Sequence, residues 1–190
     1  MNTPTHLIAA SAVLARPGAQ IRNRAIIAGA LIPDLSIYLM SAWAILAGRM
    51  NEELWQVTYW QEPWQTLGAV TNSVPLAFAI FALGIWRRWP ALQVFAGAML
   101  IHAALDFPVH AEDAHRHFWP FSDWRFHSPV SYWDPQHHGL WGGLLDCGVL
   151  FAGIALLWAR FTAVWVRGVL GALAALGLVY AGLIISFGLT

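Results

Sequence analysis

The sequence predicts an all-α protein, a polytopic integral membrane helical bundle of about five transmembrane helices with a short N-terminal helix and a structured outer loop. Composition is the first reason, because 58% of the 190 residues are hydrophobic and only 11% are charged. A soluble domain carries roughly 25% charged residues. The formal net charge is zero, which leaves no basic surface for a nucleic-acid partner. The single cysteine excludes an internal disulfide and a cysteine-rich metal site.

Five apolar stretches supply the predicted membrane spans, since a helix needs about 20 residues to cross a bilayer. They are Ala25–Gly48, Leu67–Trp86, Ala91–Phe107, Gly139–Trp158 and Thr162–Phe187. The further apolar run Leu7–Ala15 is too short to span, and we expect a re-entrant or interfacial helix there. Thr3 and Pro4 precede it as an N-cap and a first helical residue. Residues 1–190 therefore form a single membrane domain, with membrane lipids as partners.

The charges between these spans sort into two groups, which predicts an orientation. One group consists of arginines without any acid: Arg16, Arg22, Arg24, Arg87, Arg88, Arg160 and Arg167. The other group mixes the remaining arginines with the acidic residues of the connections. Because positive loops stay in the cytoplasm, the connections 49–66 and 108–138 and the C-terminus are expected to face outward. In a bacterial inner (cytoplasmic) membrane that side is the periplasm.

A few polar residues lie inside the predicted spans: Asp34, Asn72, His102, Asp106 and Asp146. A charge at the bilayer centre costs about 2.5–3.5 kcal/mol, so such groups face the bundle interior and by default mark a site. Asn72 is expected to bond to a neighbouring helix. Asp146 has a structural interpretation that is at least as good as a functional one.

The segment from His102 to His117 carries the strongest signal. At about 100° per residue, positions 102, 106, 110, 113 and 117 would share one helical face about 80° wide. A histidine and a carboxylate four residues apart, as in His102 and Asp106, can bind one divalent cation. Pro108 can end or kink the helix, which weakens the prediction beyond it. The alternative is a His–Asp pair that only satisfies itself in the core.

Three further residues are candidate ligands. Asp34 follows Pro33 inside the first span, where it is either a ligand, a proton carrier or a cap of the second half-helix. His6 is either a ligand near the outer surface or a solvated histidine. His110 is the next histidine on the face of His102 and Asp106.

The outer loop 108–138 is rich in histidine and tryptophan. It holds six of the eight histidines: His110, His115, His117, His127, His137 and His138. A connection of this length is expected to have structure of its own. It is either a lid with an aromatic surface for a lipid-like ligand, or an interfacial cap with solvated histidines.

A family resemblance rests on these motifs. His102-x3-Asp106 followed by Pro108-x-His110 resembles the signature of zinc-dependent phospholipase C and P1 nuclease. The chain is more similar to their membrane relatives, the inner-membrane-associated metal-dependent hydrolases. Those relatives share Thr5-His6 before an apolar helix, a Leu-Pro-Asp similar to Ile32-Pro33-Asp34, and a Trp-Pro-Phe like Trp119–Phe121. The likeness covers roughly residues 3–125.

The resemblance implies a membrane-embedded hydrolase that acts on a phosphoester or lipid-like substrate from the outer side. It implies a divalent metal, zinc, held by His6, Asp34, His102, Asp106 and His110, with Asp34 and His110 also placed for catalysis. The sequence departs from the family at Thr71-Asn72-Ser73, where the relatives carry histidines. That departure favours the alternative, a non-catalytic accessory or assembly subunit of a larger membrane protein complex. A small transporter or proton relay is a third reading, which the lack of an inverted repeat disfavours.

Overall fold

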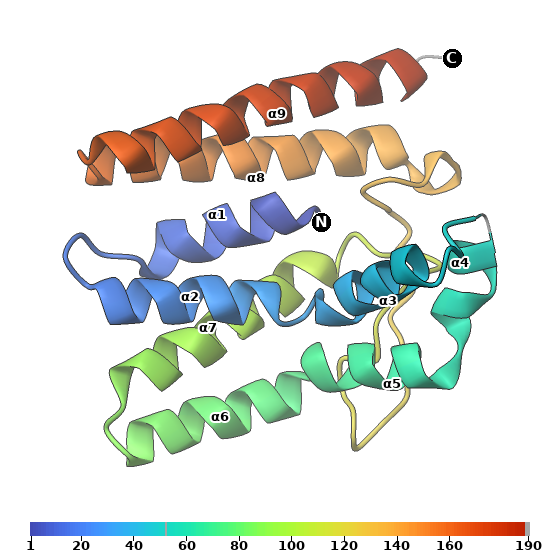
Figure 1. Ribbon diagram of the computed structural model, residues 1–190, viewed down its shortest axis with the longest axis horizontal. Coiled ribbons are helices and arrows are strands. Elements are labelled where there is room, and N and C mark those ends of the chain that lie inside the picture. Colours follow the sequence, from blue (N-terminus) through green and yellow to red (C-terminus); the bar gives the residue numbers. More distant parts are fainter. Residues whose placement is uncertain (52, 189–190) are drawn as a thin grey trace.

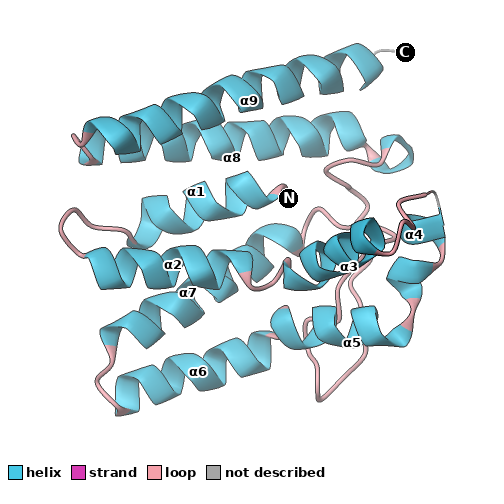
Figure 2. Cartoon of the chain, in the orientation of Figure 1, coloured by secondary structure: helices cyan, strands magenta, loops and turns pink. Residues whose placement is uncertain are grey.

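The computed structural model describes residues 1–51 and 53–188 and is helical throughout the ordered elements (Figures 1 and 2). In chain order the elements are α1 (Thr3–Leu14), α2 (Gln20–Leu31), α3 (Leu35–Leu46), α4 (Glu53–Gln56), η1 (Thr58–Trp60), α5 (Glu62–Thr71), α6 (Val74–Trp86), α7 (Pro90–Asp106), η2 (Pro135–His137), α8 (Gly139–Arg160) and α9 (Val164–Gly188). No strand occurs in these two described ranges. The all-α prediction is confirmed.

The number of helices that could cross a membrane is smaller than expected. Three are long and apolar enough, namely Glu62–Trp86 (α5 with α6), α8 and α9. A fourth exists if α2 and α3 count as one span across their 69° bend. Helices α1 and α7 are apolar but shorter. The part of the chain that the structure describes thus has three to four apolar helices that could span a membrane, and the predicted count of about five is not confirmed.

The bend between α2 and α3 occurs at Pro33 and Asp34. Proline has no amide hydrogen to donate, so the helical ladder breaks there. The carbonyl of Pro33 is instead satisfied from α5, accepting hydrogen bonds from the Asn72 amide (2.9 Å) and the Thr71 hydroxyl (3.1 Å). Asn72 therefore bonds to a neighbouring element, as the sequence predicted. The broken backbone at this depth is covered by protein, which is the condition under which it is tolerated.

Helix α7 runs through the middle of the bundle, between α6 on one side and α1 and α2 on the other (Figure 1). Its approach to α2 is unusually close at Gly29. A Cβ atom added at Gly29 would lie 2.1 Å from the backbone oxygen of Phe95. Only a glycine fits at that position, and the close approach brings the end of α2 beside the outer half of α7.

Helices α8 and α9 form a hairpin that packs on the far side of α1. Their shared core consists of Ile8, Ala12, Leu150, Ile154, Leu157 and Leu170. A second core joins α1, α2 and α7 around Ala10, Ile26, Ala30 and Ala98. Helix α1 is therefore packed between the hairpin and the central pair α2–α7.

The connections gather at two ends of the molecule. The α1–α2, α6–α7 and α8–α9 turns, which carry the acid-free arginines, lie at one end in Figure 1. The long segment from Phe107 to Asp134 lies at the other end with α4 and η1. It packs onto α6 through the backbone hydrogen bond from Val74 N–H to His117 O (2.9 Å), and the bond from Tyr132 N–H to Val109 O (3.0 Å) joins its two ends.

Candidate metal centre

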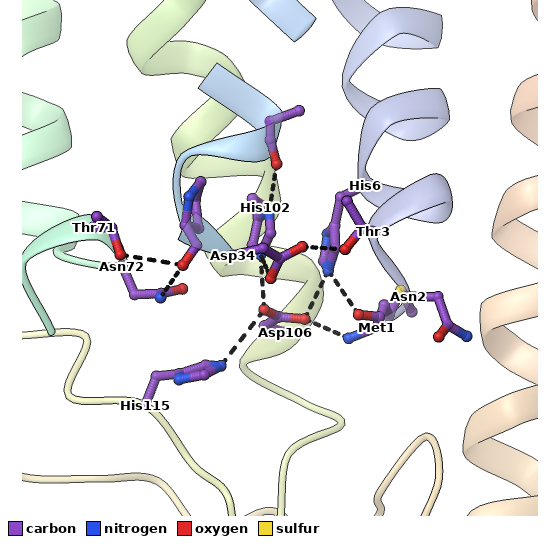
Figure 3. Close-up of polar contacts among 12 residues, drawn as sticks. Met1, Asn2, Thr3, His6, Asp34, Thr71, Asn72, His102, Asp106 and His115 are labelled. Carbon is purple, nitrogen blue, oxygen red and sulfur yellow. Dashed lines mark hydrogen bonds and ion pairs between the residues drawn. The ribbon is translucent and has the colours of Figure 1, made fainter. Parts of the chain in front are cut away.

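The centre is built around the carboxylate of Asp106, the last residue of α7, which is 1% exposed. Its Oδ1 lies 2.9 Å from Nε2 of His6 and 3.2 Å from Nε2 of His110. Its Oδ2 lies 3.0 Å from Nε2 of His102 and 3.9 Å from Nε2 of His115. Figure 3 shows the carboxylate between His6 of α1, His102 of α7 and His115 of the outer loop. One acid therefore faces four imidazoles.

His102 is oriented as a ligand. Its Nδ1 lies 2.9 Å from the carbonyl oxygen of Ala30, at the end of α2. A carbonyl only accepts, so Nδ1 carries the hydrogen and Nε2 presents its lone pair to Asp106. That Nε2 is buried and makes no hydrogen bond. A histidine whose second nitrogen donates to a backbone carbonyl is the arrangement found at metal sites.

His6 comes from the first turns of α1 and is fully buried. Its ring stacks on that of His102, with centroids 3.5 Å apart and planes 9° from parallel. His6, His102 and Asp106 each offer a ligand atom, and these atoms all lie within 4.8 Å of one another. The structure thus brings together three of the five predicted metal ligands as one group.

Asp34 lies at the edge of this group. Its Oδ1 is 3.5 Å from Nε2 of His102, and its Oδ2 accepts a hydrogen bond from the Thr3 hydroxyl. Tyr38 in turn donates to that hydroxyl at 2.7 Å. The Asp34 carboxylate makes no cap hydrogen bond at the start of α3, so its side chain serves the cluster rather than the half-helix.

His110 reaches Asp106 by a route other than the predicted one. Helix α7 ends at Asp106, so the helical face extends over His102 and Asp106 and no further. A turn across Pro108 carries His110 back onto the carboxylate. The expectation that His117 continues this face is wrong, because its Nδ1 instead hydrogen bonds to the carbonyl of Asn72 at 3.2 Å.

Two acids act on His110. Burial opposes a charged imidazole, but the carboxylates of Asp106 and Asp113 outweigh it and raise the pKa of His110 to about 9. Nδ1 of His110 lies 2.9 Å from Oδ2 of Asp113. Burial alone would raise the pKa of Asp113, but His110 and the Trp133 indole N–H, 3.0 Å away, lower it to about 2.

His115 is a member of the centre that the sequence did not single out. Asp106, His110 and His115 form a second group whose ligand atoms lie within 4.8 Å of one another. Burial and the neighbouring His110 hold the pKa of His115 well below its usual range, so its imidazole is neutral. On a continued helix His115 would lie about 220° from His102, facing away from it. The only sequence signal for it was the density of histidines in the loop.

The amino group of Met1 also enters the centre. Its ammonium forms an ion pair with Asp106 and lies 3.3 Å from Nε2 of His110. Side-chain motifs carry no information on a main-chain amine, so sequence analysis could not find this contact.

Two groups that share Asp106 are chemically suited to a metal. Neutral imidazole and carboxylate are ligands that Zn²⁺ and similar divalent ions take. Nε2 of His102, which faces Asp106, is buried and makes no hydrogen bond. An uncompensated buried polar atom is costly, and a bound cation would remove that cost. The donor set therefore fits a metal ion.

A cavity of about 620 Å³ adjoins the centre. Its walls are largely aromatic: Trp55, Tyr59, Trp60, Tyr132 and Trp133. His110, Asp113 and His115 border it. The cavity therefore connects an apolar chamber with one side of the Asp106 cluster.

The remaining polar candidates lie elsewhere. Asp146 is buried in α8 and hydrogen bonds to Asn2 rather than to the cluster. His137 lies between Asp134 (2.7 Å) and Glu112 (3.7 Å). His127 donates from Nδ1 to the Ala111 carbonyl at 2.9 Å. These histidines stabilise the outer segment.

No protein-family model matches the chain, and no curated protein or solved structure matches it either. The class follows from the fold and the cluster alone. The chain is an all-helical protein with several apolar helices that could span a membrane and a buried His/Asp cluster that could hold a metal ion.

Proposed function

We propose that the protein is a membrane-embedded hydrolase that uses a divalent metal, zinc, to cleave a phosphoester or lipid-like substrate. The observation that carries the proposal is the convergence of His6, His102, His110 and His115 on the single carboxylate of Asp106. Burial of so many ionisable groups is costly unless a shared cation compensates them. The family resemblance of the His-x3-Asp segment supports the same chemistry.

The residues divide into binding and proton-handling roles. His6, His102 and Asp106 would hold the metal, which lowers the pKa of a bound water and polarises the scissile group. Asp34 is 13% exposed at the edge of the group, where it can accept a proton from an attacking water. His110 carries a proton at neutral pH because of its two acids, and it borders the cavity. It can protonate the leaving oxygen.

The aromatic cavity supports an amphipathic substrate. Its volume of about 620 Å³ is in the usual range of ligand pockets, roughly 300–1,000 Å³. Its walls offer apolar surface to a hydrocarbon portion, while the histidines face the opposite, polar portion. Most residues that line the cavity belong to the connections 49–66 and 108–138, which lie at the same end of the molecule.

The orientation is part of the proposal. The acid-free arginines lie at the end opposite the cavity, so the positive-inside rule places the cavity at the outer face. In a bacterial inner membrane that face is periplasmic. Bent α2–α3 and short α7 would then complete about five crossings.

Metal analysis of the purified protein tests the proposal directly. We expect one or more equivalents of zinc per chain and hydrolysis of bis(p-nitrophenyl) phosphate by the metal-loaded protein. His102→Ala should lose both, because it removes an oriented ligand. His127→Ala is the matched control, since His127 is exposed and contacts only a backbone carbonyl. Absence of stoichiometric metal, or metal content unchanged by His102→Ala, would refute the proposal.

The alternative is a non-catalytic accessory subunit of a larger membrane complex, and the surface of α9 favours it. Large apolar side chains along α9 are exposed, among them Val164, Trp165, Leu176, Leu178 and Val179. Either lipid or a partner helix must cover them. Co-purification with one complex at fixed stoichiometry, without hydrolysis, would favour the accessory function. An active protein isolated alone would exclude it.

A further inference from the structure

Asp146 is a buried acid that the metal centre does not use. It lies in α8, is 1% exposed, and its carboxylate faces the start of α1. Its Oδ1 accepts the backbone N–H of Asn2 at 3.0 Å, and its Oδ2 accepts the side-chain amide of Asn2 at 2.9 Å. Both oxygens are thus committed to one residue of another helix. Burying an acid inside an apolar helix costs free energy, so we expect Asp146 to have a structural or functional role.

Helix α1 begins with residues typical of a helix start, Asn2 and Pro4, but no side chain of its own caps it. Its N-cap residue, Asn2, makes no side-chain cap hydrogen bond, and the first turn contains no acid. The N-terminal backbone N–H groups of a helix have no partner within the helix, and a nearby negative charge stabilises that end. Asp146 provides both the acceptor and the charge from a different helix.

Packing does not hold this end of α1 on the side of Asp146. A cavity of about 170 Å³ lies there, lined by Asn2, Pro4, Thr5, Asp146 and residues of α9. Farther along, α1 is packed tightly, since a Cβ added at Gly153 would lie 2.6 Å from Cγ2 of Ile8. The first turn therefore depends on hydrogen bonds, whereas the following turn depends on contact with α8.

The first turn of α1 also carries the groups that reach the metal centre. His6 N–H bonds to the carbonyl of Asn2 at 3.2 Å, so the two residues are one turn apart. His6 contacts Asp106, and the Thr3 hydroxyl donates to Asp34. A shift of Asn2 would move both contacts. The structure thus links the α8–α9 hairpin, which offers no ligand of its own to the two groups, to the geometry of the centre.

We infer that Asp146 is a positioning residue: through its two hydrogen bonds to Asn2, it fixes the first turn of α1 and thereby holds His6 against Asp106. Only the predicted effect of Asp146 on metal binding rests on the proposed function. The structural part of the inference, that Asp146 fixes the first turn of α1, can be tested without any metal.

Hydrogen–deuterium exchange of the metal-free full chain in detergent tests the structural half. Asp146→Ala should speed exchange in the peptide covering the first turn of α1 by about tenfold, because it leaves the two Asn2 donors unpaired. Exchange in α7 should not change. Asn2→Ala removes only the side-chain bond and should give a smaller increase, which keeps the test decisive if Asp146→Ala folds poorly.

Two further variants separate positioning from a general effect on folding. Asp146→Asn can keep both hydrogen bonds if the Asn2 amide rotates, so it should restore most of the protection. Gly148→Ala is the control on the same helix, since a Cβ there meets no atom within 4 Å. Unchanged exchange in α1 for both Asp146→Ala and Asn2→Ala would overturn the inference.

Zinc binding tests the consequence for the centre. Loss of an orienting partner typically weakens metal affinity about 10–100-fold, and we expect that range for Asp146→Ala. X-ray absorption of the zinc-loaded variant should show one imidazole fewer than the wild type. If the wild type binds no zinc, the proposed function fails while the exchange result still decides the role of Asp146. If zinc affinity and imidazole number are unchanged by Asp146→Ala, the positioning of His6 is refuted and the proposed function stands.

Discussion

The short and broken helices of this molecule differ from its long ones in what they carry. Helices α1 and α7, and the bend between α2 and α3, supply His6, His102, Asp106 and Asp34 to the cluster. Helices α8 and α9 are uninterrupted, pack through an apolar core and offer no ligand to the two groups, and their buried acid Asp146 contacts Asn2 instead. Where a helix ends or is broken, some backbone groups lose their partners within the helix, and side chains of different elements can come together. An intact helix in lipid satisfies its own backbone and offers little to a site.

The largest expected effect comes from removing the shared acid of the broken-helix region. Asp106→Ala should weaken zinc binding by about 100-fold or more, because the loss of an outer partner alone costs up to about that much. It should also lower stability, since it leaves the buried imidazoles and the Met1 ammonium without their acid. Isothermal titration with zinc and thermal unfolding measure the two effects.

Asp123→Ala is the matched control for Asp106→Ala. Asp123 is 76% exposed and, among the residues that the structure describes, pairs only with Arg116 at 3.3 Å. Exposed pairs of this kind contribute little. A zinc affinity that falls equally in both variants would contradict the central role of Asp106.

Replacing a glycine by alanine in each of the two regions should have smaller effects, and these should differ between the regions. Gly29→Ala should lower stability by about 1–3 kcal/mol, because its Cβ would collide with the Phe95 carbonyl and separate α2 from α7. It should also weaken zinc binding, since Ala30 orients His102. Gly148→Ala in α8 should instead leave stability unchanged or raise it by up to about 1 kcal/mol. Equal effects at both positions in thermal unfolding would remove the contrast.

Zinc affinity should also depend on pH. In the metal-free protein the pKa of His110 is about 9, so the imidazole holds a proton below that pH. If His110 contributes its lone pair to the metal, binding must release this proton. Zinc affinity should then rise by about tenfold per pH unit as the pH approaches 9, and level off above it. Asp113, with a pKa of about 2, stays charged throughout.

His110→Gln identifies the source of this slope. If His110 is a ligand, the variant should bind zinc more weakly and show a flatter dependence of affinity on pH between 7 and 9. A wild-type affinity that does not change over that range would mean that His110 keeps its proton and acts beside the metal rather than on it.

Local patterns in the sequence predicted the helical parts of the centre. His102 and Asp106 lie four residues apart within one helix, so the helical period alone fixes their relation. Pro33 followed by Asp34 predicted a break at depth for the same local reason. The Thr5-His6 motif predicted His6 as a ligand, and the composition of residues 108–138 predicted an aromatic outer segment.

The remaining features depend on contacts between distant segments. His115 and the true route to His110 follow from where the chain turns after Asp106, which no periodicity encodes. The role of Asp146 depends on the placement of α8 beside α1. The predicted count of about five spans is not confirmed, because the apolar length of a segment does not give the 69° angle between α2 and α3.

The bend at Pro33 has a mechanical consequence for the chamber beside the cluster. Ile37, Trp55 and Tyr59 follow the bend in the chain, whereas Tyr132 and Trp133 belong to the segment after α7. The cavity is therefore lined by two segments, one that leaves directly from the bend and one that follows α7. A change of a few degrees at the bend would move the first segment relative to the second and alter the width of the cavity, whereas His102 and Asp106 lie on α7, which packs on α2 before the bend.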